Sequence, residues 1–306
     1  MSGRPYAEVI GDPIAQSKSP TIHNFWLGKL GIDAEYRARH VREEELADYF
    51  AQRPKDAEWR GCNVTMPHKQ AVLPLIDRLD SKAKLIGAVN TIVPDASGHL
   101  VGYNTDVDGF LEPLMPLLAE RKVGRVSIIG TGGAARAVLS AFSMFADKGD
   151  ESGSEMTIVL AGRHQDRALS LLKELLHAVA NDASATSIDE FRLLLSERGG
   201  TATRSGPAKG DKAAIADIVV NASALGMVGK PSLDLELSSL PENSIVYDIV
   251  THPIDTELLS QARRNGLRTI DGFAMLIGQA AAAFEKFFGQ PAPREYDAEL
   301  RALLTA

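Results

Sequence analysis

Two patterns of hydrophobic and polar residues alternate along the middle and later parts of the chain. Short apolar runs rich in β-branched residues, clearest at residues 125–129 and 245–250, are typical of strands buried on both faces of a sheet. Longer stretches with helical spacing of apolar residues, at residues 134–145 and 166–180, predict helices. This alternation predicts a parallel sheet with helices on both faces. Further strands are expected at residues 156–161 and 218–221.

The part of the chain before this alternation shows both patterns in shorter elements. Ser19-Pro20 favours a helix start, because proline in the first turn has no N–H group to leave unpaired. Pro74 is expected to kink or restart a helix within residues 69–80. Strands are expected at residues 6–10, near Tyr36 and at 61–64, helices at 43–50, 69–80 and 109–121, and a hairpin of residues 88–93 with 100–101.

Two later segments stand out by composition. Residues 273–288 are strongly apolar but include Gln279, Glu285 and Lys286, so we expect a helix packed on a core and no membrane span. Residues 183–212 are rich in Ser, Thr, Gly and Ala, and residues 199–210 have few apolar side chains. We expect a surface loop over residues 199–210 and assign the longer segment no function.

The composition is that of a soluble protein with two domains. The 306 residues, 44% hydrophobic and 24% charged, suffice for two hydrophobic cores. The net charge of -7 argues against a nucleic-acid-binding surface, which usually has a basic excess. Cys62 is the only cysteine, which excludes an internal disulfide and suits a reducing compartment. Residues 1–10 lack the pattern of a signal peptide, so we expect a cytoplasmic location.

A glycine-rich segment, Gly130-Thr131-Gly132-Gly133-Ala134, lies between a predicted strand and a predicted helix. Gly130 can form the tight turn, and Gly132 or Gly133 lets the backbone approach a pyrophosphate. The free N–H groups and the dipole at the helix N-terminus attract phosphates. A glycine-rich turn alone also occurs in proteins that bind no nucleotide, but its place between strand and helix favours a dinucleotide site.

The end of the next predicted strand bears on the choice between NADP and NAD. NAD sites usually have an acidic residue there, which binds the ribose 2′-hydroxyl. This chain has Arg163, followed by Arg167, and two guanidinium groups suit the 2′-phosphate of NADP. Asp166 keeps NAD open as the alternative, and the arginines could also simply solvate a helix start.

Three polar motifs precede the glycine-rich segment. Ser17 and Ser19 could bind one carboxylate together, or Ser19 could cap the following helix. Lys69 follows the strand that contains Asn63, and a lysine at a helix start is electrostatically unfavourable, which favours a functional role. Asp106 could be an ordinary helix cap. Together the amide, hydroxyl, ammonium and carboxylate groups could bind a small polyhydroxylated acid and supply a proton.

The order of these motifs along most of the chain resembles the shikimate/quinate dehydrogenase family. Six motifs, in the order of the family, carry the resemblance. They are Gly11-Asp-Pro-Ile-Ala-Gln-Ser17-Lys-Ser19-Pro-Thr-Ile-His23, Asn63-Val-Thr65-Met-Pro-His-Lys69, Gly87-Ala-Val-Asn90-Thr91, Asn104-Thr-Asp106, Gly130-Thr-Gly-Gly-Ala-Ala-Arg136 and Asp271-Gly-Phe-Ala-Met-Leu-Ile-Gly-Gln279-Ala.

The resemblance implies an α/β fold of two domains: an N-terminal α/β substrate domain and a Rossmann-like, doubly wound dinucleotide-binding domain. The last helix would return to the first domain, so we expect the substrate domain at residues 1–105 plus 272–306 and the NAD(P)-binding domain at residues 106–271. The implied activity is reversible hydride transfer between the nicotinamide of NADP, or alternatively NAD, and the ring 3-hydroxyl of shikimate, in aromatic amino acid biosynthesis. No metal, membrane or nucleic acid is implied, and the oligomeric state is open between monomer and homodimer.

The resemblance also implies roles for single residues. Lys69 and Asp106 would form the catalytic pair, in which the ammonium stabilises charge on the ring oxygen and the carboxylate fixes the ammonium. Ser17 and Ser19 would hold the substrate carboxylate. The ring hydroxyls would be held by Asn63, Thr65, Asn90 and Gln279, and the cofactor by Gly130, Thr131, Gly132, Gly133, Ala134, Arg163, Arg167, Ala222 and Gly272.

Two positions depart from the usual pattern of the family. Thr251 stands where most members have a tyrosine that reaches the substrate carboxylate, and the shorter side chain leaves room for a different substituent. Gly162-Arg163-His164 replaces the usual Asn-Arg-Thr and keeps only its arginine. Quinate or an aminoshikimate-type substrate therefore stays open. A silent dinucleotide-binding sensor is a further alternative, against which the presence of both Lys69 and Asp106 argues.

Overall fold

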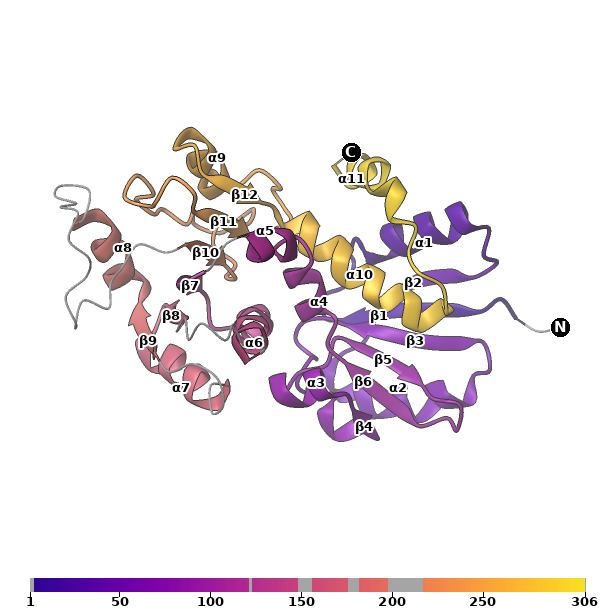
Figure 1. Cartoon of the computed structure of the whole chain (residues 1–306). Helices are drawn as coiled ribbons and strands as arrows, with labels where there is room; N and C mark the ends of the chain where they lie inside the picture. The colour runs from indigo at the N-terminus through magenta and orange to yellow at the C-terminus, as the bar shows by residue number, and fades with distance from the viewer. Residues whose placement is uncertain (1–2, 121–122, 148–155, 176–181, 198–216, 306) are drawn as a thin grey trace. The chain divides into compact units, whose positions relative to one another are not determined.

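The computed structural model describes residues 3–120, 123–147, 156–175, 182–197 and 217–305. The chain forms two compact units (Figure 1). Unit 1 comprises Met1–Gly109 and Leu276–Ala306, and unit 2 comprises Phe110–Met275. Each unit is built on a six-stranded sheet of its own. Unit 1 is therefore discontinuous in sequence, with unit 2 inserted into it.

The sheet of unit 1 is mixed and has the strand order β2-β1-β3-β5-β6-β4. Parallel pairing joins β1 to β2 and β3, whereas β5 is antiparallel to both β3 and β6. The antiparallel register places Thr91 of β5 opposite Asn63 of β3. The strands are β1 (Tyr6–Gly11), β2 (Glu35–His40), β3 (Trp59–Val64), β4 (Arg78–Leu79), β5 (Thr91–Pro94) and β6 (Leu100–Tyr103), which confirms the predicted hairpin.

Helices of unit 1 come from both ends of the chain. Proline in the first turn of α1 and glycine after its last turn, at Gly31 with φ of 64°, match the preferences of helix ends. Residues of β1 and β2 pack against Ala283 and Phe287 of the last long helix, α10, so the C-terminal segment completes the core of unit 1. The helices are α1 (Ser19–Leu30), α2 (Leu46–Gln52), α3 (Ser81–Ile86), α4 (Asp106–Leu111), α10 (Gly272–Phe288) and α11 (Asp297–Thr305). The unit boundaries fall within α4, after Gly109, and within α10, before Leu276.

Two predicted helices are wrong or broken, and prolines explain both. Residues 69–80 form turns, a short 3-10 helix at Leu73–Leu75 and strand β4 instead of an α-helix, because Pro74 has no N–H group to donate. Lys69 therefore does not lie at an α-helix start, and the electrostatic argument built on that position fails. The helix predicted at residues 109–121 is interrupted at Pro113, between α4 and α5 (Met115–Glu120).

The sheet of unit 2 is parallel throughout and has the strand order β12-β11-β10-β7-β8-β9. The first strand of this unit, β7, lies centrally, and the order reverses between β7 and β10. This is the order of doubly wound dinucleotide-binding folds, in which ligands bind at the carboxyl ends of the strands beside the reversal. The strands are β7 (Arg125–Ile129), β8 (Thr157–Gly162), β9 (Asp182–Ser187), β10 (Ile218–Asn221), β11 (Ile245–Asp248) and β12 (Arg268–Ile270).

The remaining described helices of unit 2 are α6 (Gly133–Asp147), α7 (Gln165–Leu175), α8 (Ile188–Glu197) and α9 (Glu257–Arg264). Arg136 of α6 donates from its guanidinium to the Glu174 carboxylate of α7 at 2.9 Å, which ties the two helices together and lowers the pKa of Glu174. Strand β9 overlaps the segment 183–212 and α8 lies within it, and the composition of that segment had not predicted either element. The loop predicted at residues 199–210 lies outside the described residues.

Candidate active site

An ammonium–carboxylate pair, Lys69 with Asp106, lies in unit 1. Lys69 Nζ donates to Asp106 Oδ2 at 2.6 Å, and the side chains are 21% and 8% exposed. Lys69 lies in the turn after β3, where its backbone oxygen accepts from Val89 N at 2.8 Å, and Asp106 is the first residue of α4. The segments that follow β3 and β6, two strands on either side of β5, thus bring together the residues predicted as catalytic, and the pair is largely shielded from solvent.

The Asp106 carboxylate has a second, buried partner in Asn90. Asn90 Nδ2 donates to Asp106 Oδ1 at 2.9 Å, so the two carboxylate oxygens are held from different sides. Asn90 Oδ1 in turn accepts from the backbone N–H of Thr105 at 2.8 Å. Asn104 Oδ1 accepts from the backbone N–H of Asp106 at 3.1 Å, which fixes the backbone at the helix start. The orientation of the carboxylate is therefore set by the Lys69 ammonium and the Asn90 amide.

The amide of Asn63, at the end of β3, is held by three buried groups. Its Nδ2 donates to the backbone oxygen of Asn90 at 3.1 Å and to Thr91 Oγ1 at 2.9 Å. Tyr36 Oη donates to Asn63 Oδ1 at 2.5 Å. Burial raises the pKa of Tyr36 well above its ordinary value of 10.0, so its hydroxyl keeps the proton that it donates. Asn63 and Asn90 thus belong to one hydrogen-bonded group with the acidic member of the pair.

The other residues predicted to bind substrate in unit 1 lie at the ends of elements. Ser17 and Ser19 lie where α1 begins, and Ser19 N donates to Ser17 Oγ at 3.3 Å. The cap position of α1 is Lys18, without a side-chain cap bond, so Ser19 does not serve as the N-cap. Thr65 directly follows β3 and is partly exposed. Gln279 lies in α10, where Nε2 donates to the backbone oxygen of Leu276 at 3.0 Å.

The glycine-rich segment of unit 2 lies at the reversal of the strand order. Gly130, directly after β7, has a φ of 124°, and a Cβ there would lie 2.5 Å from the backbone oxygen of Ala222, which follows β10. Only glycine fits this position. Gly132 and Gly133 are exposed, and a Cβ on either would meet no atom within 4 Å in the described part of the chain beyond the neighbouring backbone.

These observations fit a pyrophosphate at the start of α6. The backbone beside Gly132 and Gly133 is open to a ligand, and the first N–H groups of a 15-residue helix point there without an acidic residue in the first turn. Arg163 and Arg167 are exposed after β8 and in α7, on the neighbouring strand and helix. The residues of unit 2 are thus suited to hold a dinucleotide.

Thr251 and Gly272 lie near the end of β11 in the same unit. Thr251 is partly exposed three residues after Asp248, the last residue of the strand. A Cβ on Gly272 would collide with the backbone oxygens of Val250 and Ile249, so the start of α10 packs directly on this segment. Position 272 therefore needs glycine for packing, whether or not the residue also lies beside a cofactor.

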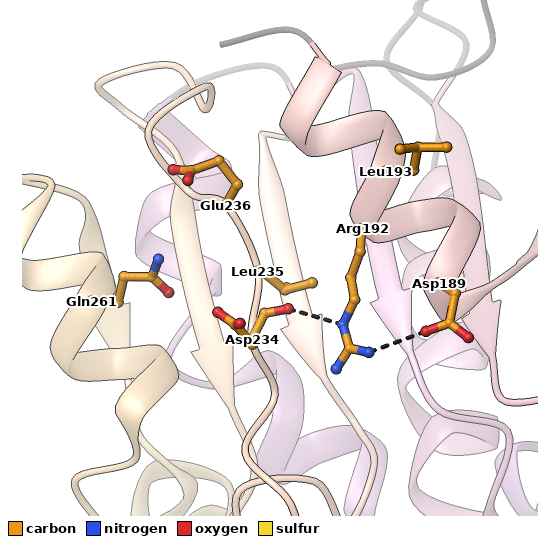
Figure 2. Close-up of a pocket in the computed structure, with 7 residues that line it drawn as sticks. All are labelled: Asp189, Arg192, Leu193, Asp234, Leu235, Glu236 and Gln261. Carbon is orange, nitrogen blue, oxygen red and sulfur yellow. Dashed lines mark hydrogen bonds and ion pairs between the residues drawn. The ribbon is translucent and has the colours of Figure 1, made fainter.

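A groove of about 410 Å³ in unit 2 lies apart from all of these residues (Figure 2). Arg192 of α8 spans it, donating from Nε to the backbone oxygen of Asp234 at 3.0 Å and from Nη1 to Asp189 Oδ1 at 3.1 Å. None of the predicted site residues lines this groove. Because its one guanidinium group already has protein partners, we assign the groove no role in the chemistry.

Sequence reasoning missed three buried hydroxyl residues beside the pair: Tyr36, Thr91 and Thr105. Thr105 Oγ1 donates to Asn90 Oδ1 at 3.2 Å, and Thr91 joins Asn63 to Asn90. Thr91 and Thr105 each adjoin a predicted site residue in sequence, which is the signal that could have found them. No such signal exists for Tyr36, which reaches Asn63 only through the pairing of β1 with β2 and β3.

Neither a metal centre nor a membrane span is found in the part of the chain that the structure describes. Within those residues no three or more His, Cys, Asp or Glu side chains gather in a way that could hold a metal ion. No described helix is both long and apolar enough to cross a bilayer.

Comparisons with known proteins agree along the whole chain. The family model described as shikimate dehydrogenase substrate binding domain matches residues 9–92, and that described as shikimate 5'-dehydrogenase C-terminal domain matches residues 272–299. The shikimate dehydrogenase (NADP(+)) of Sphingopyxis alaskensis is 47% identical over 304 residues, which cover 99% of this chain and 97% of the relative.

Solved structures show the same architecture. Shikimate 5-dehydrogenase from Listeria monocytogenes, in complex with shikimate and NAD, superposes with a TM-score of 0.80 at 29% identity, covering 97% of this chain and 96% of that one. Quinate dehydrogenase from Corynebacterium glutamicum, in complex with NAD, has a TM-score of 0.79 at 30% identity, covering 98% and 99%. The predicted two-domain α/β fold with a Rossmann-like unit is confirmed. The chain belongs to the shikimate dehydrogenase family.

Proposed function

We propose that this chain is an NADP-dependent shikimate dehydrogenase, which interconverts shikimate and 3-dehydroshikimate by hydride transfer at ring carbon 3. The observation that carries the proposal is the shielded pair of Lys69 and Asp106, in a chain that is 47% identical to a shikimate dehydrogenase (NADP(+)). Unit 1, with its polar residues at strand ends, is the proposed substrate domain, and unit 2 the proposed cofactor domain. Small molecules are the only partners that this activity requires, and a cytoplasmic location stays a prediction.

Lys69 is the proposed acid–base group. As the ring ketone becomes an alkoxide, the ammonium stabilises the developing negative charge and donates a proton to the oxygen; in the reverse direction the amine takes that proton back. Asp106 keeps the ammonium in place through the 2.6 Å contact and balances its charge. Because the pair is mostly buried, the attraction between its members is stronger than in water.

Recognition of the substrate is proposed for polar groups of unit 1. The hydroxyls of Ser17 and Ser19 would donate to the ring carboxylate. Asn63, Thr65, Asn90 and Gln279 would contact the ring hydroxyls. None of these side chains is a cation that could neutralise the substrate carboxylate. Their contribution therefore lies in orienting the ring oxygen toward Lys69.

Unit 2 is proposed to hold the cofactor. The N–H groups beside Gly132 and Gly133 would bind the pyrophosphate, and the guanidinium groups of Arg163 and Arg167 the 2′-phosphate. When bound, NADP supplies the hydride for reduction of the ketone and accepts it in the reverse direction.

Quinate is the second candidate substrate, because Thr251 is shorter than the tyrosine usual in the family and a quinate dehydrogenase is among the structural neighbours. Initial rates with shikimate and with quinate, each with NADP and with NAD, decide between the two. We expect the fastest turnover with shikimate and NADP. A preference for quinate would support the second candidate, and no reduction of either cofactor by either acid would refute both.

Two lysine variants test the assigned pair. Lys69→Ala is expected to lower kcat by about 10²–10⁴-fold, the usual contribution of a positioned acid–base group. Lys82→Ala is the matched control, because Lys82 also pairs with an aspartate of unit 1, Asp108, but both side chains are substantially exposed, at 37% and 42%. Unchanged activity in Lys69→Ala would show that the assigned acid–base group is wrong.

A further inference from the structure

A single buried hydroxyl joins the two amides that lie beside the acid–base pair. Thr91 Oγ1 accepts from Asn63 Nδ2 at 2.9 Å and donates to Asn90 Oδ1 at 3.0 Å. Thr91 is 0% exposed, so water cannot take over either bond. From Asn90 the connection continues through Nδ2 to Asp106 Oδ1 at 2.9 Å, and from Asp106 to Lys69. The hydroxyl is thus two hydrogen bonds away from the Asp106 carboxylate.

The donors and acceptors around Thr91 fix which way each amide faces. Asn63 Oδ1 is occupied by Tyr36 Oη, and its two amide hydrogens go to the Asn90 backbone oxygen and to Thr91. Asn63 therefore retains only a lone pair on Oδ1, and it can accept from a ring hydroxyl but has no free N–H to donate. The Thr91 hydroxyl, having accepted from Asn63, directs its own hydrogen at Asn90 Oδ1. That oxygen also accepts from the backbone N–H of Thr105, so the Thr91 and Thr105 donors together keep Asn90 Nδ2 directed at Asp106.

We propose that Thr91 is a positioning residue for the Lys69–Asp106 pair, acting through Asn90, and that it couples the orientation of Asn63 to that of the pair. The inference rests on the proposed function, because the pair is assigned there as the acid–base machinery. Packing alone does not account for the hydroxyl, since valine has the same shape and needs no partners in a buried strand. Threonine at this position supplies one donor and one acceptor where the two amides need them.

Thr91→Val tests the proposal, because it removes the hydroxyl and keeps the shape of the side chain. With shikimate and NADP we expect kcat to fall by roughly tenfold, because a loosened carboxylate no longer holds the ammonium in its reactive position. The KM for NADP should stay unchanged. The solvent deuterium isotope effect on kcat should rise, because proton transfer becomes slower relative to the other steps. Thr91→Ser keeps the hydroxyl and should restore kcat and the isotope effect to near the wild-type values.

Thr256→Val is the matched control for loss of a buried hydroxyl. Thr256 lies in unit 2, is 1% exposed, donates to Asp248 Oδ2 at 2.7 Å and accepts from Leu259 N at 3.3 Å. Its loss should lower the unfolding temperature without raising the isotope effect. If Thr91→Val and Thr91→Ser behave alike in kcat and isotope effect, or if Thr91→Val changes only the unfolding temperature, the proposal is overturned.

The orientation of Asn90 supplies a readout that does not depend on activity. In a crystal structure of Thr91→Val, or of Thr91→Ala should the valine variant not fold, we expect the distance from Asn90 Nδ2 to Asp106 Oδ1 to lengthen beyond hydrogen-bond range, while the Thr105 N–H keeps its contact with Asn90 Oδ1. An amide that keeps its 2.9 Å contact would overturn the proposal, whatever the enzyme turns over. Wild-type protein inactive on shikimate, with a lengthened contact between Asn90 and Asp106 in the variant, would instead refute the proposed function and leave the positioning role supported.

Discussion

Replacing His23 by phenylalanine is expected to make unit 1 more resistant to acid. His23 lies in α1 with 0% exposure, and neither ring nitrogen has a hydrogen-bond partner among the described residues. Its ring stacks on Tyr36 at 4.0 Å between centroids, with 5° between the planes, and meets Trp26 edge-on at 5.8 Å. Burial lowers the pKa of His23 from 6.5 to about 3, because the charged ring would have no water around it.

The direction and size of the effect follow from this lowered pKa. The unfolded chain takes up a proton at His23 below pH 6.5, whereas the folded chain does so only near pH 3, so stability present above pH 6.5 is lost as the pH falls. A pH of about 5 lies about 1.5 units below the pKa of His23 in the unfolded chain. Protonation of the unfolded chain therefore lowers the free energy of unfolding by about 2 kcal/mol. The figure hardly changes for any folded-state pKa below about 4, so it depends little on the depth of the shift.

Urea unfolding followed by tryptophan fluorescence measures this loss. The chain has two tryptophans, Trp26 and Trp59, and both are buried in unit 1, so the signal reports the unit that contains His23. Between about pH 7 and about pH 5 the free energy of unfolding of wild type should fall by about 2 kcal/mol more than that of His23→Phe. At about pH 7 the two should differ by less than about 2 kcal/mol, because the variant loses no hydrogen bond but adds ring volume.

His99→Gln serves as the control, because the His99 side chain is in the same unit and is 50% exposed. It should lose stability with falling pH as wild type does. Parallel losses in wild type and His23→Phe between the two pH values would refute the argument, since they would mean that His23 can be charged in the folded state or is not buried.

Three further predictions concern other parts of the chain. Gly130→Ala should destabilise unit 2 by more than about 1 kcal/mol, given its φ of 124°, whereas Gly132→Ala should change the unfolding temperature little but weaken NADP binding measured by calorimetry. Arg53→Met should lower the free energy of unfolding in urea by about 3–5 kcal/mol, because the buried Glu8 carboxylate loses its charge partner. In wild type this carboxylate lies 2.6 Å from the Arg53 guanidinium and its side chain is 3% exposed. The double variant with Glu8→Gln should recover much of the lost stability. Burial raises the pKa of Asp248, so the stability that this carboxyl group contributes is present at a pH below its ordinary pKa and is lost as the pH rises. Between about pH 4 and pH 7 the unfolding temperature of Asp248→Asn should therefore rise relative to that of wild type.

Periodicity was sufficient to predict four of the six strands of the unit 2 sheet, but neither β9 nor β12, and only part of unit 1. Parallel strands buried on both faces are continuous apolar runs, so β7, β10 and β11 stand out from their flanks. The stretch after Lys69 also has helically spaced apolar residues, yet Pro74 and the pairing of β4 with β6 decide its conformation. The first effect is local and the second is long-range, and the spacing of apolar residues predicts neither.

The candidate site divides in the same way. Lys69 and Asp106 were predicted together only through the resemblance to a family, because 37 residues separate them and no spacing rule connects the turns in which they lie. The two serines before α1 show the limit of local reasoning, since the helix begins at Ser19 itself and the capping alternative, equally consistent with the sequence, is not realised. The support of the pair by Tyr36 and Thr91 depends on strand register, which a single sequence does not supply.

The departure at position 162 has a physical cause in unit 2. A Cβ on Gly162 would lie 2.8 Å from Thr131 Cγ2 and 3.3 Å from the backbone oxygen of His164, so the methyl group of Thr131 occupies the space that a side chain at 162 would need. A side chain at 162, such as the asparagine usual in the family, would therefore require the Thr131 side chain to move. In the proposed cofactor site the exposed guanidinium of Arg163 remains at that strand end as a group able to meet a 2′-phosphate. The glycine at 162 thus fits the packing against Thr131, and the absence of the asparagine does not by itself argue for NAD.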